Sequence, residues 1–568
     1  MREYLRTHTN PPVFIISGIV VVAFVLWGIL GPSNVSAVTG VLNTFVTTNF
    51  EWVYILGTSA LLVFVVAMLF TRYGRVRLGP DDSRPEYSAL AWFAMLFTAG
   101  MGIGLVFYAA SEPITHLTGP PTGEAGTVAA ADNAMLYTFF HWLFHPWAVY
   151  IVLGLALGYF AFRRGLPLRP ASAFYPLIGE RIYGPVGHAV DILAVFGTLF
   201  GIATSLGIGG SQVGAGLESV FGLENNATLQ IIVICAITAV ATVSVMLGID
   251  KGIRNLSLIN LWLAFGLMIF VFLVGPTLLL LNSISANIGF YLQNLPALSF
   301  QTFPSGGEQA QGWQAGWTLF YWGWWISWSP FVGMFLARIS YGRTIRSFIG
   351  GALFAPVGAS AVWLTIFGNA ALQSAQANPN GAITTTTANN PDATMFVLLE
   401  QLAPGNALYI AASILTVVVI VLFFATSSDS GSLVVDILTN GGDPNPKWQQ
   451  RLFWALLEGA IAIVLLSAGA ASGTDPLGAL QTASILAGLP FAIVLFIMAY
   501  GLVKGLGEER LPSTLPEPGQ DSIPPEPGRA VTNTNGGSMS PGSPSPQNVS
   551  SRMSSEKPGQ QDREQGNR

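Results

Sequence analysis

Long apolar runs separated by short polar segments repeat along most of this 568-residue chain. An α-helix of about 20 apolar residues is long enough to cross the hydrocarbon core of a bilayer. Twelve runs approach or exceed this length, and we expect each to be a membrane-spanning helix. The predicted spans are residues 12–31, 52–71, 88–110, 137–162, 187–215, 228–248, 258–282, 316–337, 346–372, 407–437, 451–468 and 480–504. A shorter apolar stretch, residues 290–300, is expected to be an interfacial helix.

This pattern predicts an all-α polytopic membrane protein in a lipid bilayer. Composition supports the prediction, because 9% of the residues are charged, whereas soluble domains have about 25%. Cys235 is the only cysteine, which excludes a disulfide or a thiolate metal site within one chain. The first apolar run is too long for the core of a signal peptide, so we expect a retained helix.

The charges sort to the two sides of the predicted membrane. All 24 Lys and Arg residues fall at the N-terminus, after even-numbered spans or in the tail. An excess of Lys and Arg marks the cytoplasmic side. Both termini are therefore predicted to be cytoplasmic, in a bacterial-type inner (cytoplasmic) membrane, and the number of spans must be even. The alternate loops are expected to carry only acids, such as Glu51, Glu112, Glu124, Asp132, Glu308 and Asp392.

Two predicted spans contain helix-disturbing residues. The third span holds glycines at every second position in Ala99–Gly104, and the eighth holds Ser329 and Pro330 followed by Gly333. These spans lie five apart, and interruptions at matching positions of two halves indicate an inverted-repeat transporter. Close packing of helices through small residues is the alternative for the glycines.

We therefore divide the chain into five parts. Two extra spans precede the first repeat, a loop with an interfacial helix joins the repeats, and a Pro-, Gly- and Ser-rich tail is expected to be disordered in the cytoplasm. The predicted parts are residues 1–87, 88–283 (first repeat), 284–315, 316–504 (second repeat) and 505–568.

Several other functions find no support in the sequence. The chain has no Walker-type phosphate-binding sequence, and no signature of a nucleic-acid partner. An enzyme would need acids, His or Cys clustered on facing spans, and a channel a continuous polar ring; we see neither, and expect no cofactor. His141 and His145 have no Glu or further His nearby in sequence, so we interpret them as structural. A non-transporting osmosensor remains an alternative.

Aromatic residues are concentrated in two spans. Trp317–Gly333 holds five of the fifteen tryptophans, although Trp usually lies in belts at the membrane interface. On span four, Trp142, Trp147 and Tyr150 fan over one side of a helix. With Trp325 they would form a four-walled box, an arrangement that favours quaternary ammonium. The alternatives are an interfacial belt on span four and tryptophans that only fill volume between helices.

Span ten ends in four hydroxyl residues around Asp429. Such hydroxyls usually bond back to their own helix, but four are more than this needs. A hard cation prefers oxygen ligands, so we predict a cation site that uses Thr426, Ser427 and carbonyls of the third span. Other acids in or near spans are functional candidates by default, and none is expected at the aromatic box. These acids are Asp191, Asp436 and Glu458.

Four segments together resemble the betaine/choline/carnitine transporter family. They read GMGIGLVFY from Gly100, FHWLFHPWAVY from Phe140, FYWGWWISWSPFVGMFLARIS from Phe320 and TSSDSGS from Thr426. The resemblance covers about residues 12–504. It implies a LeuT-like core of two inverted five-helix repeats behind two N-terminal helices, twelve helices in all, and a homotrimer.

The resemblance also implies a substrate and its site. The substrate would be a trimethylammonium compound held in an aromatic box. Choline-selective relatives often carry Asp where this chain has Gly104, so we expect a zwitterionic osmolyte such as glycine betaine. The implied substrate-binding residues are Trp142, Trp147, Tyr150, Trp325, Trp324, Trp328, Gly100, Met101, Gly102, Gly104 and Ser205.

Coupling to Na⁺ is implied by the same resemblance. Sodium-independent exchangers of the family lack the hydroxyls that Thr426 and Ser427 supply here. A second sodium position would use Thr198 and Phe331, but Ile202 stands where a second threonine is expected, which puts a two-sodium stoichiometry in question. The tail does not resemble the basic helix of osmosensing members. The first sodium site would consist of Thr98, Met101, Phe423, Thr426 and Ser427.

Overall fold

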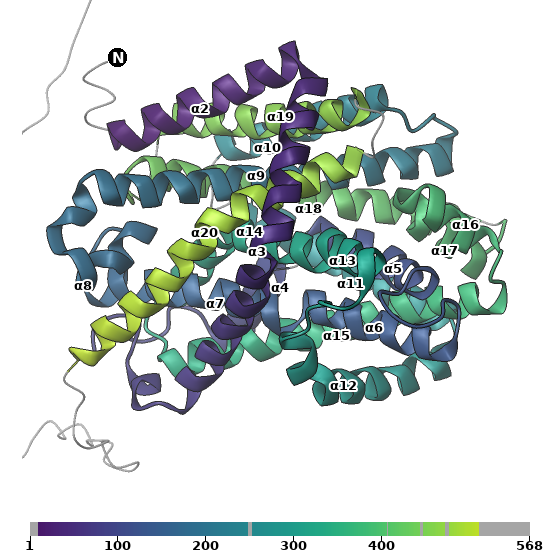
Figure 1. Cartoon of the computed structure of the whole chain (residues 1–568), viewed down its shortest axis with the longest axis horizontal. Coiled ribbons are helices and arrows are strands. Elements are labelled where there is room, and N and C mark those ends of the chain that lie inside the picture. Colours follow the sequence, from purple (N-terminus) through teal and green to yellow (C-terminus); the bar gives the residue numbers. More distant parts are fainter. Residues whose placement is uncertain are drawn as a thin grey trace, which may run out of the picture. The chain divides into compact units, whose positions relative to one another are not determined.

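The computed structural model describes residues 9–100, 102–247, 253–405, 407–443, 447–471 and 476–509 (Figure 1). In these ranges the regular structure is helical, apart from an isolated bridge between Arg77 and Thr344. The α-helices are α2 (Pro11–Leu30), α3 (Pro32–Phe70), α4 (Ala89–Gly100), α5 (Ile103–Thr118), α6 (Val128–Trp142), α7 (Phe144–Gly158), α8 (Tyr175–Ile178), α9 (Pro185–Phe221), α10 (Ala227–Leu247), α11 (Ile253–Val274), α12 (Thr277–Ser299), α13 (Gly307–Gln314), α14 (Phe320–Arg338), α15 (Ile345–Ala377), α16 (Ala382–Asn389), α17 (Thr394–Leu402), α18 (Ala407–Thr439), α19 (Trp448–Ala471) and α20 (Pro476–Gly507).

The predicted all-α polytopic architecture is confirmed. Eight helical segments of the described chain are long and apolar enough to cross a membrane, and a ninth is added if α11 and α12 count as one bent span. All twelve predicted ranges contain helix. The aromatic-rich α14 is not among the eight, and α4 and α5 are separate short helices.

Two connecting segments differ from the prediction. Residues 32–51, expected to be a loop, belong to the 39-residue helix α3, so Glu51 lies within a helix. The predicted span 258–282 ends earlier, at Val274, and the chain turns by 113° into α12. The bend coincides with Gly275 and Pro276, a pair that ends one helix and begins another. The predicted interfacial helix over residues 290–300 is therefore the second half of a longer helix.

The predicted interruptions are found in one span and not in the other. Span three is broken between α4 and α5, where Gly102 has an extended backbone. In span eight, α14 continues unbroken through Pro330, so the prediction of an interruption there is wrong. A π-helical turn, η5 (Ala315–Leu319), precedes α14 instead. Span four has an unpredicted break at Leu143, between α6 and α7.

Some helix neighbours are repeated between the two halves of the chain. Helix α9 packs against α18, α19 and α20, while α18 packs against α9, α10 and α11. Likewise α7 packs against α14, and α5 packs against α15. For these pairs, exchanging each predicted span for the one five positions away turns one set into the other. The extensive packing of α14 on α20 has no comparable counterpart between α11 and α4 or α5 in the described ranges.

Small residues allow the central helices to approach closely. A Cβ atom on Gly323 of α14 would lie 2.7 Å from the Cα atom of Ile485 on α20. A Cβ atom on Gly154 of α7 would lie 2.9 Å from the carbonyl oxygen of Gly333. Backbone contact through glycine is typical of helix packing in membranes. It holds α14 between α7 and α20, and so places the aromatic side chains of α14 in the interior.

Candidate functional site

A small cavity lies where the broken span three meets α6, α9 and α14. The volume of the cavity is about 10 Å³, which is about the room that one water molecule needs. A trimethylammonium group is much larger, so the cavity has to widen before it can hold one. The cavity is lined by Gly102, Gly104, Trp142, Ser205, Trp324, Trp325 and Trp328.

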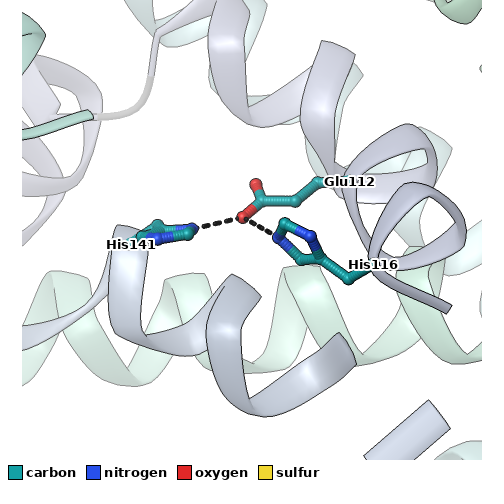
Figure 2. Close-up of side chains that lie close together, drawn as sticks. All are labelled: Glu112, His116 and His141. Atoms are coloured by element: carbon teal, nitrogen blue, oxygen red, sulfur yellow. Dashed lines mark hydrogen bonds and ion pairs between the residues drawn. The ribbon is translucent and has the colours of Figure 1, made fainter. Parts of the chain in front are cut away.

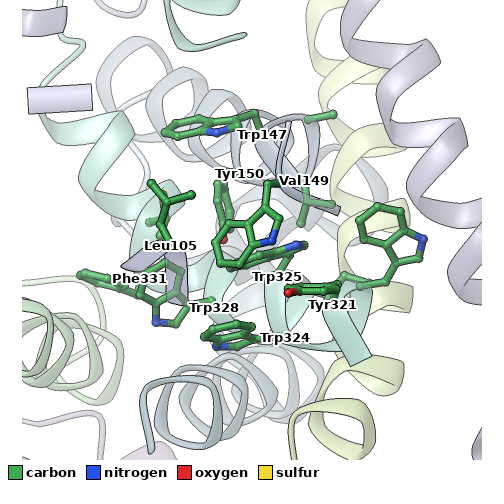
Figure 3. Packing of buried hydrophobic residues seen from close by; sticks show 14 of the residues in the cluster. Leu105, Trp147, Val149, Tyr150, Tyr321, Trp324, Trp325, Trp328 and Phe331 are labelled. Atoms are coloured by element: carbon green, nitrogen blue, oxygen red, sulfur yellow. The ribbon is translucent and has the colours of Figure 1, made fainter. Parts of the chain in front are cut away.

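The predicted box residues form one connected aromatic cluster, part of which Figure 3 shows. The ring centroids of Trp142 and Trp325 are 4.9 Å apart. Tyr150 lies 6.3 Å from Trp325 and 5.8 Å from Trp147. Trp142 and Trp325 line the cavity, whereas Trp147 and Tyr150 do not. The four predicted walls are thus together, but two of them do not reach the cavity in this conformation.

Trp324 and Trp328 complete the lining from the same helix. Trp324 stacks on Trp325 with centroids 4.7 Å apart and ring planes inclined by 12°, and its Nε1 donates a hydrogen bond to the carbonyl of Gly201. The indole Nε1 of Trp328 is buried and has no hydrogen-bond partner among the described residues. Buried donors are normally paired, so this indole N–H is available to a ligand in the cavity.

The glycines of span three let the indole rings reach the backbone. A Cβ atom on Gly104 would lie 2.5 Å from Cη2 of Trp324 and 2.8 Å from Cη2 of Trp142. A Cβ atom on Gly102 would lie 2.8 Å from Cη2 of Trp328. Gly102 also precedes the first residue of α5, and the N-terminus of a helix attracts anions. Of the other predicted residues here, Gly100 ends α4, and Met101 lies outside the described residues.

A buried carboxylate, Glu112, bonds to one wall of the cavity and also to two histidines, which Figure 2 shows with it. Oε2 of Glu112 accepts hydrogen bonds from Nε1 of Trp142 (2.8 Å) and from the hydroxyl of Tyr321 (2.5 Å). Its Oε1 lies 2.7 Å from Nδ1 of His141 and 3.2 Å from Nε2 of His116. The side chains of Glu112 and of both histidines are fully buried.

One prediction is wrong at this cluster. Glu112 lies within α5 and not in a loop, because the helix continues to Thr118. The fold also brings a Glu and a His to His141, which its neighbours in sequence did not offer. Glu112, which is not one of the acids weighed for the aromatic box from sequence, contacts the box through Trp142. The sequence signal was the spacing of Glu112 and His116, which places both on one face of a helix.

The predicted cation site is described only in part. The hydroxyl of Thr426 donates to the carbonyl oxygens of Leu422 (2.9 Å) and Phe423 (3.1 Å) in its own helix. Thr426 and Ser427 are almost fully buried. Met101 and the side chain of Thr98 lie outside the described residues, so the site as a whole stays a prediction.

Ile202, which stands where the predicted second sodium site would have a threonine, packs against the neighbouring helix. A Cβ atom on Gly431 would lie 2.0 Å from Cδ1 of Ile202, so the isoleucine packs directly on the backbone of α18. Thr198 already donates its hydroxyl hydrogen to the carbonyl of Ala194, and Phe331 packs on Trp328. Thr204 bonds to Leu480 and Ser484 of α20, away from this position.

Two of the candidate acids have structural partners. Asp191 forms an ion pair with Arg169 at 2.9 Å and accepts a hydrogen bond from the backbone of Ala171. Oε2 of Glu458 accepts hydrogen bonds from Ser428 and Ser432, both 3.1 Å long. These contacts join α9 to the segment before it and α18 to α19.

Comparison with known proteins decides the family. The model of the betaine/carnitine/choline family of transporters matches residues 12–511. The chain belongs to this family. It is therefore a multi-pass membrane transporter and not an enzyme, and the predicted resemblance is confirmed. The environment of the transporter is a membrane.

Individual relatives narrow the comparison. The transporter is 43% identical to a probable glycine betaine transporter of Desulfitobacterium hafniense, over 87% of this chain and 97% of the relative. It is 41% identical to a glycine betaine transporter of Bacillus subtilis, over 86% of this chain and 93% of the relative. It is also 40% identical to an osmo-dependent choline transporter of Acinetobacter baylyi, over 88% of this chain and 72% of the relative.

Proposed function

We propose that this transporter imports glycine betaine, or a closely similar zwitterion, by symport with sodium. The supporting observation is the lining of the cavity. None of the described residues that line it is charged, and an unpaired charge buried within a membrane is costly. The nearby carboxylate of Glu112 is turned toward two histidines and two aromatic side chains, so none of its oxygens lines the cavity. A substrate that brings its own counter-charge into the cavity therefore fits it better than a bare cation.

The two ends of the cavity suit the two ends of a zwitterion. Indole faces of Trp142 and Trp325 attract the trimethylammonium group by cation–π interaction. The N-terminus of α5 and the unpartnered Nε1 of Trp328 offer hydrogen-bond donors to the carboxylate. Trp147 and Tyr150 would join the aromatic lining as the cavity widens, and Ser205 already lines it. Gly100 and Met101 stay predicted substrate-binding residues. Asp at position 104 would have no room in this conformation.

We propose twelve spans in the inner membrane, namely two N-terminal spans followed by two inverted repeats of five, with both termini in the cytoplasm. The matching helix neighbours of the two halves support a LeuT-like repeat. Sodium would bind at Thr98, Met101, Phe423, Thr426 and Ser427, and the apolar packing of Ile202 favours a single ion. A homotrimer remains a prediction from the family.

The alternative is a choline- or carnitine-type carrier, or a sodium-independent exchanger of the same fold. The choline transporter among the relatives keeps this alternative open. The test is uptake of radiolabelled glycine betaine into proteoliposomes with an inward sodium gradient, and with potassium replacing sodium. Saturable uptake that needs sodium and resists excess choline supports the proposal. Uptake that ignores sodium, or choline uptake that exceeds betaine uptake, would overturn it.

A further inference from the structure

The hydrogen bonds around His116 fix the position of its proton. Nδ1 of His116 lies 3.2 Å from Nε1 of Trp313, and an indole N–H is only a donor. Nδ1 must therefore accept, and a neutral His116 carries its hydrogen on Nε2, which points at Oε1 of Glu112. His116 is thus a fixed donor to the carboxylate.

The same bonds argue against a metal ion at this cluster. Ligand atoms of Glu112, His116 and His141 lie within 4.8 Å of one another, close enough to share an ion. A histidine that binds a metal through one nitrogen almost always donates a hydrogen from the other. His116 cannot do so, because its other nitrogen faces the N–H of Trp313. A proton is the better ligand.

His141 is the group that can gain or lose this proton without losing a hydrogen bond. Its Nδ1 faces Glu112, and its Nε2 lies 3.0 Å from the hydroxyl of Thr318. A threonine hydroxyl is both donor and acceptor, so it can donate to a neutral His141 or accept from a protonated one. Thr318 thereby accommodates either state by rotating one O–H bond.

The ring and backbone of His141 contact the walls of the cavity. Its carbonyl oxygen accepts a 2.9 Å hydrogen bond from Nε1 of Trp325. Its ring stacks on Tyr321, with centroids 4.7 Å apart and planes inclined by 24°. The next residue, Trp142, is bound to Glu112. A change of charge at His141 therefore acts beside both indoles that would hold the substrate cation.

We propose that His141 is a proton-binding site, with Glu112 as its counter-ion, and that proton binding there opposes substrate binding in the cavity. When His141 is protonated, the pair is neutral. When His141 is neutral, the negative charge of Glu112 is uncompensated. From its place next to Trp142, this charge attracts a quaternary ammonium group in the cavity. Binding of substrate should then release a proton. This inference rests on the proposed substrate, although the proton site itself does not.

Among the titratable groups packed around Glu112, His141 is the one that we expect to gain or lose a proton. Helix α5 contributes Glu112, His116 and Tyr108, and α14 contributes Tyr321. On its own α6 lies Tyr137, which contacts His116, and α12 contributes Tyr291, which packs on Phe139. His145 of α7 stacks on Trp322 and has no hydrogen-bond partner among the described residues. In the described structure no Lys or Arg belongs to this group.

The first measurement is the Kd for betaine of the purified full-length transporter at saturating sodium. Tryptophan fluorescence reports the binding, and the titration is repeated at pH values from 5.5 to 8.5. We expect Kd to rise about tenfold toward the acidic end, a coupling of ordinary size for linked sites. In weak buffer with a pH indicator, betaine should release part of a proton per site. A Kd that does not depend on pH, with no proton release, would overturn the inference.

Variants assign the proton to His141. His141→Gln keeps an N–H for Glu112 but cannot be protonated, and should abolish both the pH dependence and the proton release. His145→Gln and His188→Gln are the control variants. His145 is buried in α7, and His188 lies in the first turn of α9. Both variants should retain the pH dependence and the proton release. Retention of the pH dependence in His141→Gln would contradict the assignment.

Direct titration separates this inference from the proposed substrate. In protein labelled with [¹⁵N]histidine, the wild type should show one signal that titrates between pH 5 and 9 and is absent from His141→Gln. Signals from other histidines that titrate in this range should be present in both proteins. If that signal titrates while the wild type binds no betaine, the substrate proposal fails and the proton site stands. If the signal does not titrate, the proton site fails whatever the transporter carries.

Discussion

Gly104 lies directly under the indole of Trp324, so that a Cβ atom at Gly104 would come within 2.5 Å of Cη2 of that ring. Gly104→Ala should push Trp324 or Trp142 out of place and weaken betaine binding about tenfold, which corresponds to about 1.4 kcal/mol. Binding measured by isothermal calorimetry tests this. Gly266→Ala is the matched control, because a Cβ atom there meets nothing within 4 Å. Equal effects of the two substitutions would mean that the cavity is not the binding site.

Trp325 makes several contacts within the aromatic cluster around the cavity. It touches Trp142, Tyr321 and Trp324 and donates to the carbonyl of His141. Loss of a desolvated cation–π contact costs about 2 kcal/mol, so Trp325→Leu should raise the Kd for betaine by about 30-fold or more.

The matched control for this substitution is Trp262→Leu on α11, where the indole is 69% exposed. It should leave binding unchanged. Thermal melting of both variants establishes that they remain folded. Normal affinity in a folded Trp325→Leu transporter would rule out the aromatic cage.

Thr426 and Thr416 make the same bond in the same helix. Each hydroxyl donates to the carbonyl four residues earlier, at 2.9 and 2.8 Å. If Thr426 is a sodium ligand, Thr426→Ala should raise the sodium concentration for half-maximal uptake about tenfold or more, while Thr416→Ala should not. Initial uptake rates over a sodium series provide the measurement, and equal shifts would displace the ion from this site.

Ile202→Thr tests the second ion position. The substitution removes the Cδ1 atom that packs on Gly431 and supplies the missing hydroxyl. We expect a smaller change in sodium activation than Thr426→Ala causes, since one site is already sufficient for coupling. A change from a hyperbolic to a sigmoidal sodium dependence would instead show that a second site can be created there.

The residues that follow span twelve bond to the end of span four. Oε2 of Glu509 lies 2.9 Å from an Arg163 nitrogen, and its Oε1 accepts from Tyr159 at 2.8 Å. Partial burial alone would raise the pKa of Glu509, but the hydrogen bonds from Arg163 and Tyr159 outweigh it and hold the pKa below its ordinary value. Glu509 therefore stabilises the fold above its unfolded-state pKa, and this stability is lost as the pH falls through the lowered folded-state pKa.

Glu509→Gln should lower the melting temperature slightly at pH 7, because partly exposed ion pairs contribute about 0–1 kcal/mol. The difference from wild type should persist down to about pH 5 and vanish in more acidic buffer, where the wild-type carboxylate is also neutral. Scanning fluorimetry across this pH range is the measurement. A difference that remains constant at pH 3 would show that charge is not the cause.

Hydropathy predicted the helices well where they are apolar and continuous. The predicted span boundaries were wrong where helices extend beyond the hydrophobic run, as in α3, or where Gly275 and Pro276 turn the chain. The break in span three followed from its glycines. Pro330 suggested a break that α14 does not have, because packing on α7, α9 and α20 holds the helix together around the missing N–H.

The aromatic cluster was accessible from sequence because its members share two short segments. The role of Glu112 was not, because its partners outside α5 come from two other elements: His141 and Trp142 on α6, and Tyr321 on α14. A linear pattern of charges assigns an acid near a helix end to a loop. Only the folded arrangement supplies the donors that make a buried carboxylate tolerable.

The narrow cavity has a consequence for the choice of substrate. Its indoles touch one another, so a substrate has to separate them before they can surround it. The attraction between a cation and the indole faces must offset the ring contacts that are lost. A compound of the same shape without a positive charge would break the same contacts and gain no such attraction.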